Sequence, residues 1–514
     1  MRTVDPSPTA PPVPGGPRPG RGRRRGFGTL LAVDLWERFS FYGMAAILVL
    51  YLTAAPERGG TGMAPQTATA VFAGYMSLTF MAGLPGGWLA DRVLGARRAV
   101  LAGGALIASG HGVLTLPSPV ALYGGLLLIV AGTGLTKPSL AAMVAAVSDD
   151  RDGPGQDRRE AAFSLFYLCI QVSALIAPVV TGLLAEKVAW HLGFAAAAFG
   201  MTAGLAQFSL GLRRFGDVGR RPVRPLGRDA AERAVRRTAA VLAASAAAAG
   251  AAASAGVLGV NGVLACLGLV TVVLPFAYLR SLRRVRGGLG GFTVLMVASS
   301  AFWMIFAQSG SVLGLFAERH TDRVVFGFEV PASWFQSVHP LFVLAVAPLL
   351  AGLWRRAGPR ADVPVKFSGA LVAAGASFLL MAVAALLAER GPVGPYWLLL
   401  VYLLHSCGEI SLAPAGLALA AAVAPSGWTG RFLAVNGLFG AVGVVVGGQL
   451  FRLTAVLPLP LYFLLLGGAV LTAGVLVGAG AGRLRVAVRA VRPSPHHGRR
   501  PTAPATSGGD RTTP

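Results

Sequence analysis

The chain has 514 residues, of which 54% are hydrophobic and only 13% are charged, and its mean hydropathy is +0.64. Soluble domains carry about 25% charged residues, so this chain has too little polar surface for a soluble protein and is expected to span a membrane many times. The net charge of +24 does not indicate a nucleic-acid partner, because the arginines concentrate in the two tails and in alternate loops.

Basic tails rich in Pro and Gly stand at both ends of the chain. Residues 1–26 lack the apolar segment of a signal peptide, and both they and residues 483–514 are predicted to be disordered. Between the tails lie fourteen apolar segments near or above the roughly 20 residues that a spanning helix needs. The predicted spans are 27–54, 67–90, 99–116, 119–147, 161–185, 190–212, 238–257, 260–279, 290–317, 333–354, 367–388, 395–423, 429–451 and 456–482.

The charges of the loops predict the orientation of these spans. If both tails are on the same side, 37 of the 45 lysines and arginines fall on that side and 6 on the other. Positive loops face the cytoplasm. The sequence therefore predicts a multi-pass protein of the cell membrane, in contact with the lipid bilayer and with both termini cytoplasmic.

The order of the spans indicates two similar halves. Residues 86–98 (GGWLADRVLGARR) and 351–360 (AGLWRRAGPR) are both basic, glycine-containing turns after the second span of a half. We expect an all-α fold with six-helix bundles at 27–212 and 290–482. A basic linker with two extra spans, residues 213–289, joins them.

Five charged residues lie well inside predicted spans, where a charge costs several kcal/mol at the bilayer centre. They comprise three acids and two bases, which is the balance expected if they line one hydrated cavity and pair across it. These residues are Asp34, Glu37, Arg38, Lys137 and Glu409.

The first three belong to the segment DLWERFSFYGM, residues 34–44. On a helix, Asp34, Glu37, Arg38 and Tyr42 form one stripe, with Asp34 and Arg38 four residues apart. We expect Asp34 to pair with Arg38, which leaves Glu37 for a proton or a distant cation. The alternative is a purely structural salt bridge between helices.

Seven segments together resemble the proton-dependent oligopeptide transporter family, a branch of the major facilitator superfamily. Residues 34–44 are similar to its ExxERFxYYG motif. The others are GGWLADRVLGARR (86–98), GTGLTKPS (132–139), FSLFYLCIQVSALIAP (163–178), FWMIFAQSG (302–310), HPLFVLAVAPLLAGLW (339–354) and EISLAPAGLALAAAVAP (409–425). The resemblance covers the whole membrane portion, and the two extra helices resemble those of bacterial members.

The resemblance implies roles for individual residues. It places Asp34, Glu37, Arg38 and Lys137 in proton coupling, and Lys137 also at the carboxylate end of the substrate. Glu409 would hold the amino end. The other substrate-binding positions that it implies are Tyr42, Gln171, Trp303, Gln308 and His339.

A peptide is a zwitterion, so it needs a cationic site at one end and an anionic site at the other. Lys137 in the first half and Glu409 in the second half supply such a pair at the interface where transporter sites lie. The alternatives are a lysine that extends to the membrane surface and a protonated glutamate in a helix contact. No phosphate-binding loop or metal spacing appears, so no cofactor is expected and the proton gradient would be the energy source.

Several positions depart from the family pattern. Ala307 stands where the family has an acidic residue, and Ala45 where it has an arginine. Gln171 and His339 replace asparagines, and His339 adds a titratable group. Arg431 takes the place of a tryptophan.

These positions leave three hypotheses. The first is proton-coupled symport of di- and tripeptides or peptide-like compounds by alternating access. The second is export or exchange of a peptide-like metabolite with altered proton coupling. The third is a sensor that binds a solute without transporting it. A membrane enzyme is not expected, because the buried charges include no nucleophile–base pair or metal set. Cys169, Cys266 and Cys407 are expected to be small buried side chains.

Overall fold

The computed structural model describes residues 21–148, 155–227, 229–237, 240, 244, 259–283, 287–425 and 428–491. The helices are α1 (Arg21–Thr53), α2 (Pro65–Leu89), α3 (Ala96–Val113), α4 (Pro119–Ser148), α5 (Gly155–Lys187), α6 (Trp190–Gly211), α8 (Val260–Arg283), α9 (Gly290–Phe306), α10 (Val312–His320), α11 (Val338–Ala357), α12 (Val363–Ala388), α13 (Tyr396–Val423), α14 (Thr429–Leu450), α15 (Leu459–Ala479) and α16 (Ala481–Val491). Two short strands, β1 (Val324–Val325) and β2 (Phe328–Glu329), pair antiparallel. Short helical turns are η1 (Pro56–Arg58), η2 (Ala90–Leu94), η3 (Leu212–Phe215), η4 (Ala307–Gly310), η5 (Ala332–Ser337), η6 (Gly358–Arg360) and η7 (Phe451–Ala455).

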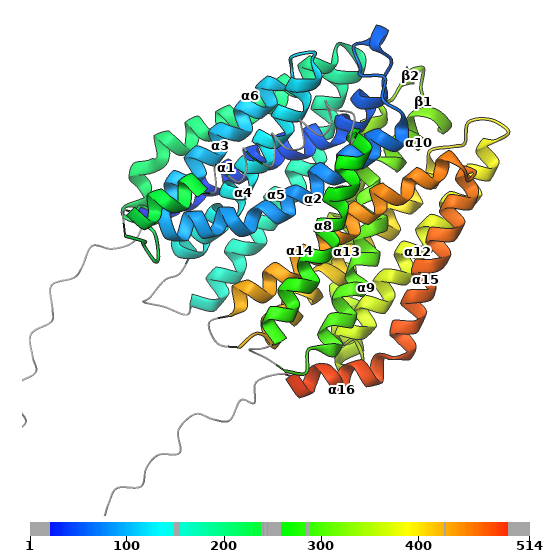
Figure 1. Ribbon diagram of the computed structural model, residues 1–514. Helices are drawn as coiled ribbons and strands as arrows, with labels where there is room; N and C mark the ends of the chain where they lie inside the picture. Colours follow the sequence, from blue (N-terminus) through cyan, green and yellow to red (C-terminus); the bar gives the residue numbers. More distant parts are fainter. Residues whose placement is uncertain are drawn as a thin grey trace, which may run out of the picture.

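Long helices run side by side through the molecule (Figure 1). We call the end with β1 and β2 the hairpin face, and the end where α1 begins and α16 lies the tail face. Helices α1 to α6 pack mainly on one another, as do α9 to α15, and α2 meets α14 between the two sets. The expected all-α polytopic fold is therefore found.

Twelve helical stretches of the described residues are long and apolar enough to cross a membrane. The predicted third span, 99–116, forms α3, which is not among the twelve, because it is short and holds Arg97, Arg98 and His111. It packs against α4 and α6. The predicted seventh span, 238–257, lies outside the described residues except for two positions. The number fourteen stays a prediction.

The tails differ from their predicted limits. Helix α1 begins at Arg21, inside the tail expected at 1–26, and α16 occupies the start of the tail expected at 483–514. The residues of α16 (AGRLRVAVRAV) place apolar side chains on one face of the helix and basic side chains on the other. Arg485 on the basic face pairs with Asp362 at the start of α12. Its apolar side meets Gly291 of α9 through Ala487 and Val488.

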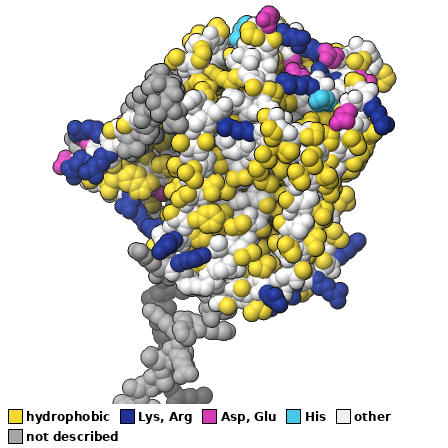
Figure 2. Space-filling model, turned by 45° about the vertical axis from the view of Figure 1, so that its right-hand side comes forward, with side chains coloured by type: hydrophobic (Ala, Val, Ile, Leu, Met, Phe, Trp, Pro, Cys, Tyr) yellow, Lys and Arg dark blue, Asp and Glu magenta, His cyan; other side chains and the backbone are white. Residues whose placement is uncertain are grey.

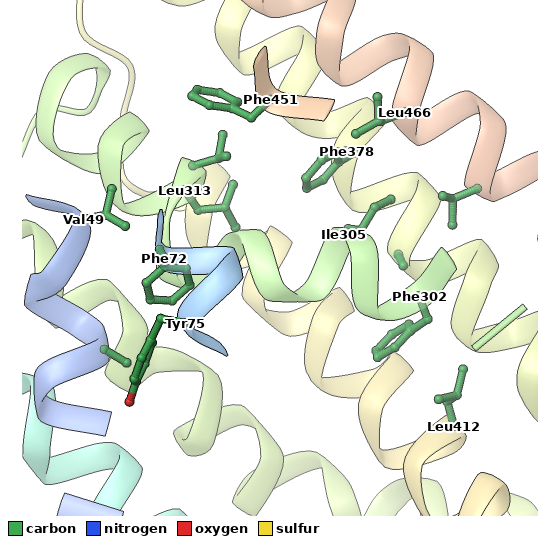
Figure 3. Packing of buried hydrophobic residues seen from close by; sticks show 14 of the residues in the cluster. Val49, Phe72, Tyr75, Phe302, Ile305, Leu313, Phe378, Leu412, Phe451 and Leu466 are labelled. Atoms are coloured by element: carbon green, nitrogen blue, oxygen red, sulfur yellow. The ribbon is translucent and has the colours of Figure 1, made fainter. Parts of the chain in front are cut away.

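The predicted span 290–317 is broken into α9, η4 and α10. The break lies where the chain carries Gln308, Ser309 and Gly310. A Cβ on Gly310 would stand 2.6 Å from Cζ of Phe72, so the glycine admits the aromatic ring of α2. Figure 3 shows Phe72 of α2 near Val49 of α1 and Leu313 of α10, with Tyr75 below Phe72, and all four belong to one apolar cluster. This cluster joins the two helix sets.

Glycines let α2 and α4 approach closely, as small residues do in membrane bundles. A Cβ on Gly86 would overlap the backbone carbonyl of Gly134, whereas one on Gly83, a turn earlier, would meet nothing within 4 Å. Gly86→Ala is therefore expected to destabilise the fold by about 1–3 kcal/mol. Thermal unfolding in detergent checks this, and Gly83→Ala is the matched control. Equal unfolding temperatures for the two variants would refute the packing argument.

Helix α8, from the linker, lies at the outside of the seam between α2 and α14 (Figure 1). Leu264 and Leu267 of α8 pack against Gly74 of α2. The Gln449 side chain of α14 donates to the carbonyl of Leu264 (3.2 Å). This extra helix therefore packs at the periphery, against both helix sets.

The expectation that the cysteines are buried is wrong. Cys266 on α8 is exposed, and Cys169 and Cys407 are partly exposed. In a lipid bilayer an apolar side chain such as cysteine can face the lipid as well as the protein interior, so its low polarity alone does not distinguish an inward from an outward position.

The basic turn after α2 anchors the start of the linker. Gly95 adopts a φ of 78°, which a glycine accepts without strain. Arg97 donates to the carbonyls of Gly216 and Val218, and the amide of Arg224 donates to the carbonyl of Asp91 (3.0 Å). The motif thus fixes the linker against the tail face.

The outer surface agrees with a membrane setting. Hydrophobic side chains cover the broad middle of the face shown in Figure 2, and charged side chains gather toward its edges. Acidic side chains and histidines appear mainly at one end of that view, while Lys and Arg also stand at the opposite end.

Candidate functional site

Three charged side chains meet on α1, within the first span. Nε of Arg38 lies 3.4 Å from Oδ1 of Asp34 and 3.4 Å from Oε2 of Glu37. Both carboxylates are fully enclosed, at 0% and 1% exposure. The expected Asp34–Arg38 pair is present, but Glu37 is not left over, because Arg38 stands between the two acids.

Lys137 of α4 approaches the same cluster from the side. Its Nζ stands 3.9 Å above the ring centroid of Phe41, which is a cation–π contact. It forms no ion pair within 4.0 Å with a described carboxylate, but Asp34 and Glu37 lie within its electrostatic range. The expected proximity to the acids is present, whereas direct pairing is not.

The cluster is arranged in two layers. Asp34 and Glu37 are closed off, whereas Arg38 and Lys137 each expose part of their side chains. Two acids and two bases balance in charge, so the buried acids depend on the two partly exposed cations. A solute anion that bound Arg38 and Lys137 would weaken their hold on the acids.

Glu409 of α13 lies in the second helix set and pairs with a histidine. Its Oε2 is 3.0 Å from Nε2 of His339 on α11, and both side chains are partly exposed, at 20% and 16%. Among the described residues no lysine or arginine pairs with Glu409. The sequence singles out the two residues separately, and no pattern in it predicts their contact.

Two tyrosines interact electrostatically with the charged groups. Tyr42, on the same helix as Asp34, is partly exposed and within electrostatic range of Arg38 and Glu409. Tyr167 of α5 is exposed, is hydrogen-bonded to Gln171, and is within range of Glu409 and Tyr42. Tyr42 thus interacts with charges of both helix sets, and Tyr167 interacts with Glu409 and with Tyr42.

Trp303 and Gln308 of the second set have different surroundings. Trp303 is partly exposed and packs edge-on against Phe302 and Phe306. Gln308 is buried, accepts a hydrogen bond from the Tyr462 hydroxyl (2.7 Å) and donates to the Met304 carbonyl (3.1 Å). Because its polar atoms are satisfied inside the protein, Gln308 is not placed to meet a substrate in this structure.

At the hairpin face, hydrogen bonds join α5 of the first helix set to η5 of the second. The Glu186 carboxylate at the end of α5 accepts from the backbone amides of Ala332 (2.7 Å) and Ser333 (3.0 Å), which begin η5, and from the Ser333 hydroxyl. Carboxylates are favoured at the positive N-terminal end of a helical turn. We call this set of contacts the hairpin-face seal.

Neighbouring contacts extend the seal. The Trp334 indole donates to the Val179 carbonyl (3.0 Å), and Lys187 pairs with Glu329 of β2 (3.0 Å), which also binds Arg323 (2.7 Å). The two cations hold the pKa of the Glu329 carboxyl below its usual value, with the hydrogen bond from Lys187 the main cause. Glu329 therefore stays ionised through the neutral range, and its pairs are lost only as pH falls toward that lowered pKa.

Sequence reasoning misses two parts of the site. Tyr167 lies within the FSLFYLCIQ segment, but only its neighbour Gln171 stands out there, because a tyrosine in an apolar run is also a common packing residue. Glu186 and Lys187 follow a predicted span and read as ordinary loop charges. No local pattern indicates that Glu186 reaches the other helix set.

Comparison with known proteins identifies the family. Residues 97–463 match the sequence model of the POT family. The chain is 34% identical over 448 residues to the uncharacterized transporter YclF of Bacillus subtilis, covering 86% of this chain and 90% of that one. It is 30% identical over 447 residues to a di-/tripeptide transporter of Lactococcus lactis subsp. cremoris, covering 84% of this chain and 89% of that one.

Solved structures agree with these relatives. A crystal structure of a peptide transporter POT in complex with sulfate shares 35% identity, with a TM-score of 0.85 and coverage of 90% of this chain and 95% of that chain. A POT family transporter in complex with a thioalcohol-conjugated peptide shares 29% identity, with a TM-score of 0.83 and coverage of 90% and 96%. The match over most of the chain, in sequence and in fold, shows that this protein belongs to the POT family.

Proposed function

We propose that the protein is a secondary transporter that carries di- and tripeptides across the cell membrane together with protons, by alternating access. Relatives that are named di-/tripeptide transporters support the substrate class. The observation that carries the proposal is a pair of opposite charges on opposite helix sets. Lys137 and Arg38 suit the carboxylate of a peptide, and Glu409 suits its ammonium group.

The layered cluster on α1 gives a physical route to proton coupling. A peptide carboxylate that binds Arg38 and Lys137 draws positive charge away from Asp34 and Glu37. An enclosed carboxylate without a cation is costly, so one of the two acids takes up a proton. Peptide and proton then stabilise each other's binding, which is the requirement for symport.

The orientation follows from the loop charges. The tail face carries the basic turn with Arg97, the linker and α16, whereas the hairpin face carries Glu186 and Glu329. By the positive-inside rule the tail face is cytoplasmic, with both termini, and the hairpin face is external. The seal then closes the outer side in this structure.

Lys137→Ala tests the proposed peptide site. Uptake of labelled dialanine into proteoliposomes under an inward pH gradient is expected to fall about 30-fold or more, because loss of one partner of a buried charge contact costs about 2–5 kcal/mol. Lys366→Ala removes a lysine at the start of α12, outside the site, and is the control. Uptake by Lys137→Ala above half of the Lys366→Ala rate would exclude this assignment.

A further inference from the structure

The Glu409–His339 pair lacks a permanent positive charge. Glu409 Oε2 and His339 Nε2 are both sealed from solvent and stand 3.0 Å apart as an ion-pair contact, and neither atom makes a hydrogen bond with any residue that the structure describes. On the opposite helix set, by contrast, Arg38 keeps its charge at all accessible pH values. The neutrality of the Glu409–His339 pair therefore depends on one proton shared by the Glu409 carboxylate and the His339 imidazole.

We propose that His339 is a built-in substitute for the peptide's ammonium group, so that Glu409 is balanced either by a proton on the pair or by a bound ammonium, and never by both. This inference rests on the proposed peptide site and concerns a residue that replaces an asparagine of the family pattern. It makes proton release from the second helix set part of substrate binding.

Neighbouring residues fix the position of the Glu409–His339 contact. Ser406, one turn before Glu409 on α13, donates from its hydroxyl to the His339 carbonyl (3.1 Å), which ties α11 to α13 at this level. Phe306 of α9 packs edge-on against the His339 ring, with centroids 5.1 Å apart. The imidazole is thus packed on one side and directed toward Glu409, as expected of a fixed partner.

Other titratable groups near the pair do not replace it. His405 of α13 is fully buried, and its Nε2 is 3.0 Å from the Ser377 hydroxyl of α12. Tyr402, on the same helix, donates to the Ser309 carbonyl of η4. From the first helix set, Tyr42 and Tyr167 lie within range of Glu409. The tyrosines stay uncharged near neutral pH, and the His405 imidazole contacts Ser377 rather than Glu409, so none of these groups neutralises the carboxylate.

The exchange balances in atoms and charge. In the peptide-free state the proton sits on His339, as an imidazolium beside the Glu409 carboxylate. An arriving ammonium binds the Glu409 carboxylate. The proton leaves through water, because an imidazolium beside an ammonium in a low-dielectric site is unfavourable. The site stays neutral in both states.

Calorimetry of dialanine binding to the purified full-length protein tests the proposal. Titrations at one pH in two buffers of different ionisation enthalpy count the protons exchanged per peptide bound. Relative to wild type, His339→Asn should release about one proton fewer. His191→Asn removes an exposed histidine at the start of α6, away from the site, and should behave as wild type. An unchanged proton count in His339→Asn overturns the proposal.

A second measurement needs no peptide. Between about pH 5 and pH 9, the folded wild-type protein should release one proton more than the double variant His339→Asn, Glu409→Gln in a potentiometric titration. Superimposable curves overturn the inference. If dialanine binds neither to wild type nor to the variants while the titration still shows the extra proton, the peptide proposal fails and the proton-bearing pair stands.

Discussion

Glu409→Gln is expected to weaken dialanine binding about 100-fold and to abolish measurable uptake. The carboxylate is the only acidic group of the second helix set that the described structure places beside the polar residues between the two sets. A glutamine keeps the shape but offers no negative charge to a desolvated ammonium, a loss of about 3 kcal/mol. Equilibrium binding by calorimetry and uptake in proteoliposomes both measure it.

The control for this variant is Glu389→Gln, the same change at the exposed end of α12 next to the hairpin face. It should bind and carry dialanine as wild type does. A matched comparison with N-acetyl-dialanine, which lacks the ammonium group, sharpens the result. Wild type should favour dialanine strongly over the acetylated compound, and Glu409→Gln should not. Binding of dialanine by Glu409→Gln within threefold of wild type contradicts the assigned role.

The fold is accessible from the sequence because the membrane imposes a simple rule. Every span must satisfy its backbone internally, so length and apolarity locate helices even without contacts. This logic places α4, α12 and α13 within a few residues. It fails where an amphipathic helix follows a span, as in α16.

The candidate site is only partly accessible in the same way. Charges inside spans are rare and costly, which singles out Asp34, Glu37, Arg38, Lys137 and Glu409 from their positions in the sequence. Their partners do not follow from such a rule. Helical spacing gives neighbours on one helix, such as Asp34 and Arg38, whereas the contact of Glu409 with His339 depends on how α11 and α13 pack.

The hairpin-face seal shows the same limit at a larger scale, and it yields the other large effect. Glu186→Gln replaces a carboxylate that accepts three hydrogen bonds by an amide whose donor end faces other donors. Hydrogen bonds to charged groups contribute about 1.5–3 kcal/mol. Because the seal exists only when the outer side is closed, its loss should shift the equilibrium toward the outward-open state by about 10- to 100-fold.

Cysteine labelling from outside measures this shift. Ser337 ends η5 beside the seal and is buried, so Ser337→Cys in a background with Cys169, Cys266 and Cys407 replaced by serine reports opening. Adding Glu186→Gln should raise the rate of reaction with a membrane-impermeant maleimide at least tenfold. Glu57→Gln, an exposed acid on the same face, should leave the rate unchanged. The seal joins the two helix sets without touching the charged site. Faster labelling, with an unaltered dialanine affinity of the outward-open state, would therefore separate gating from recognition. An unchanged labelling rate would mean that other contacts keep the outer side closed.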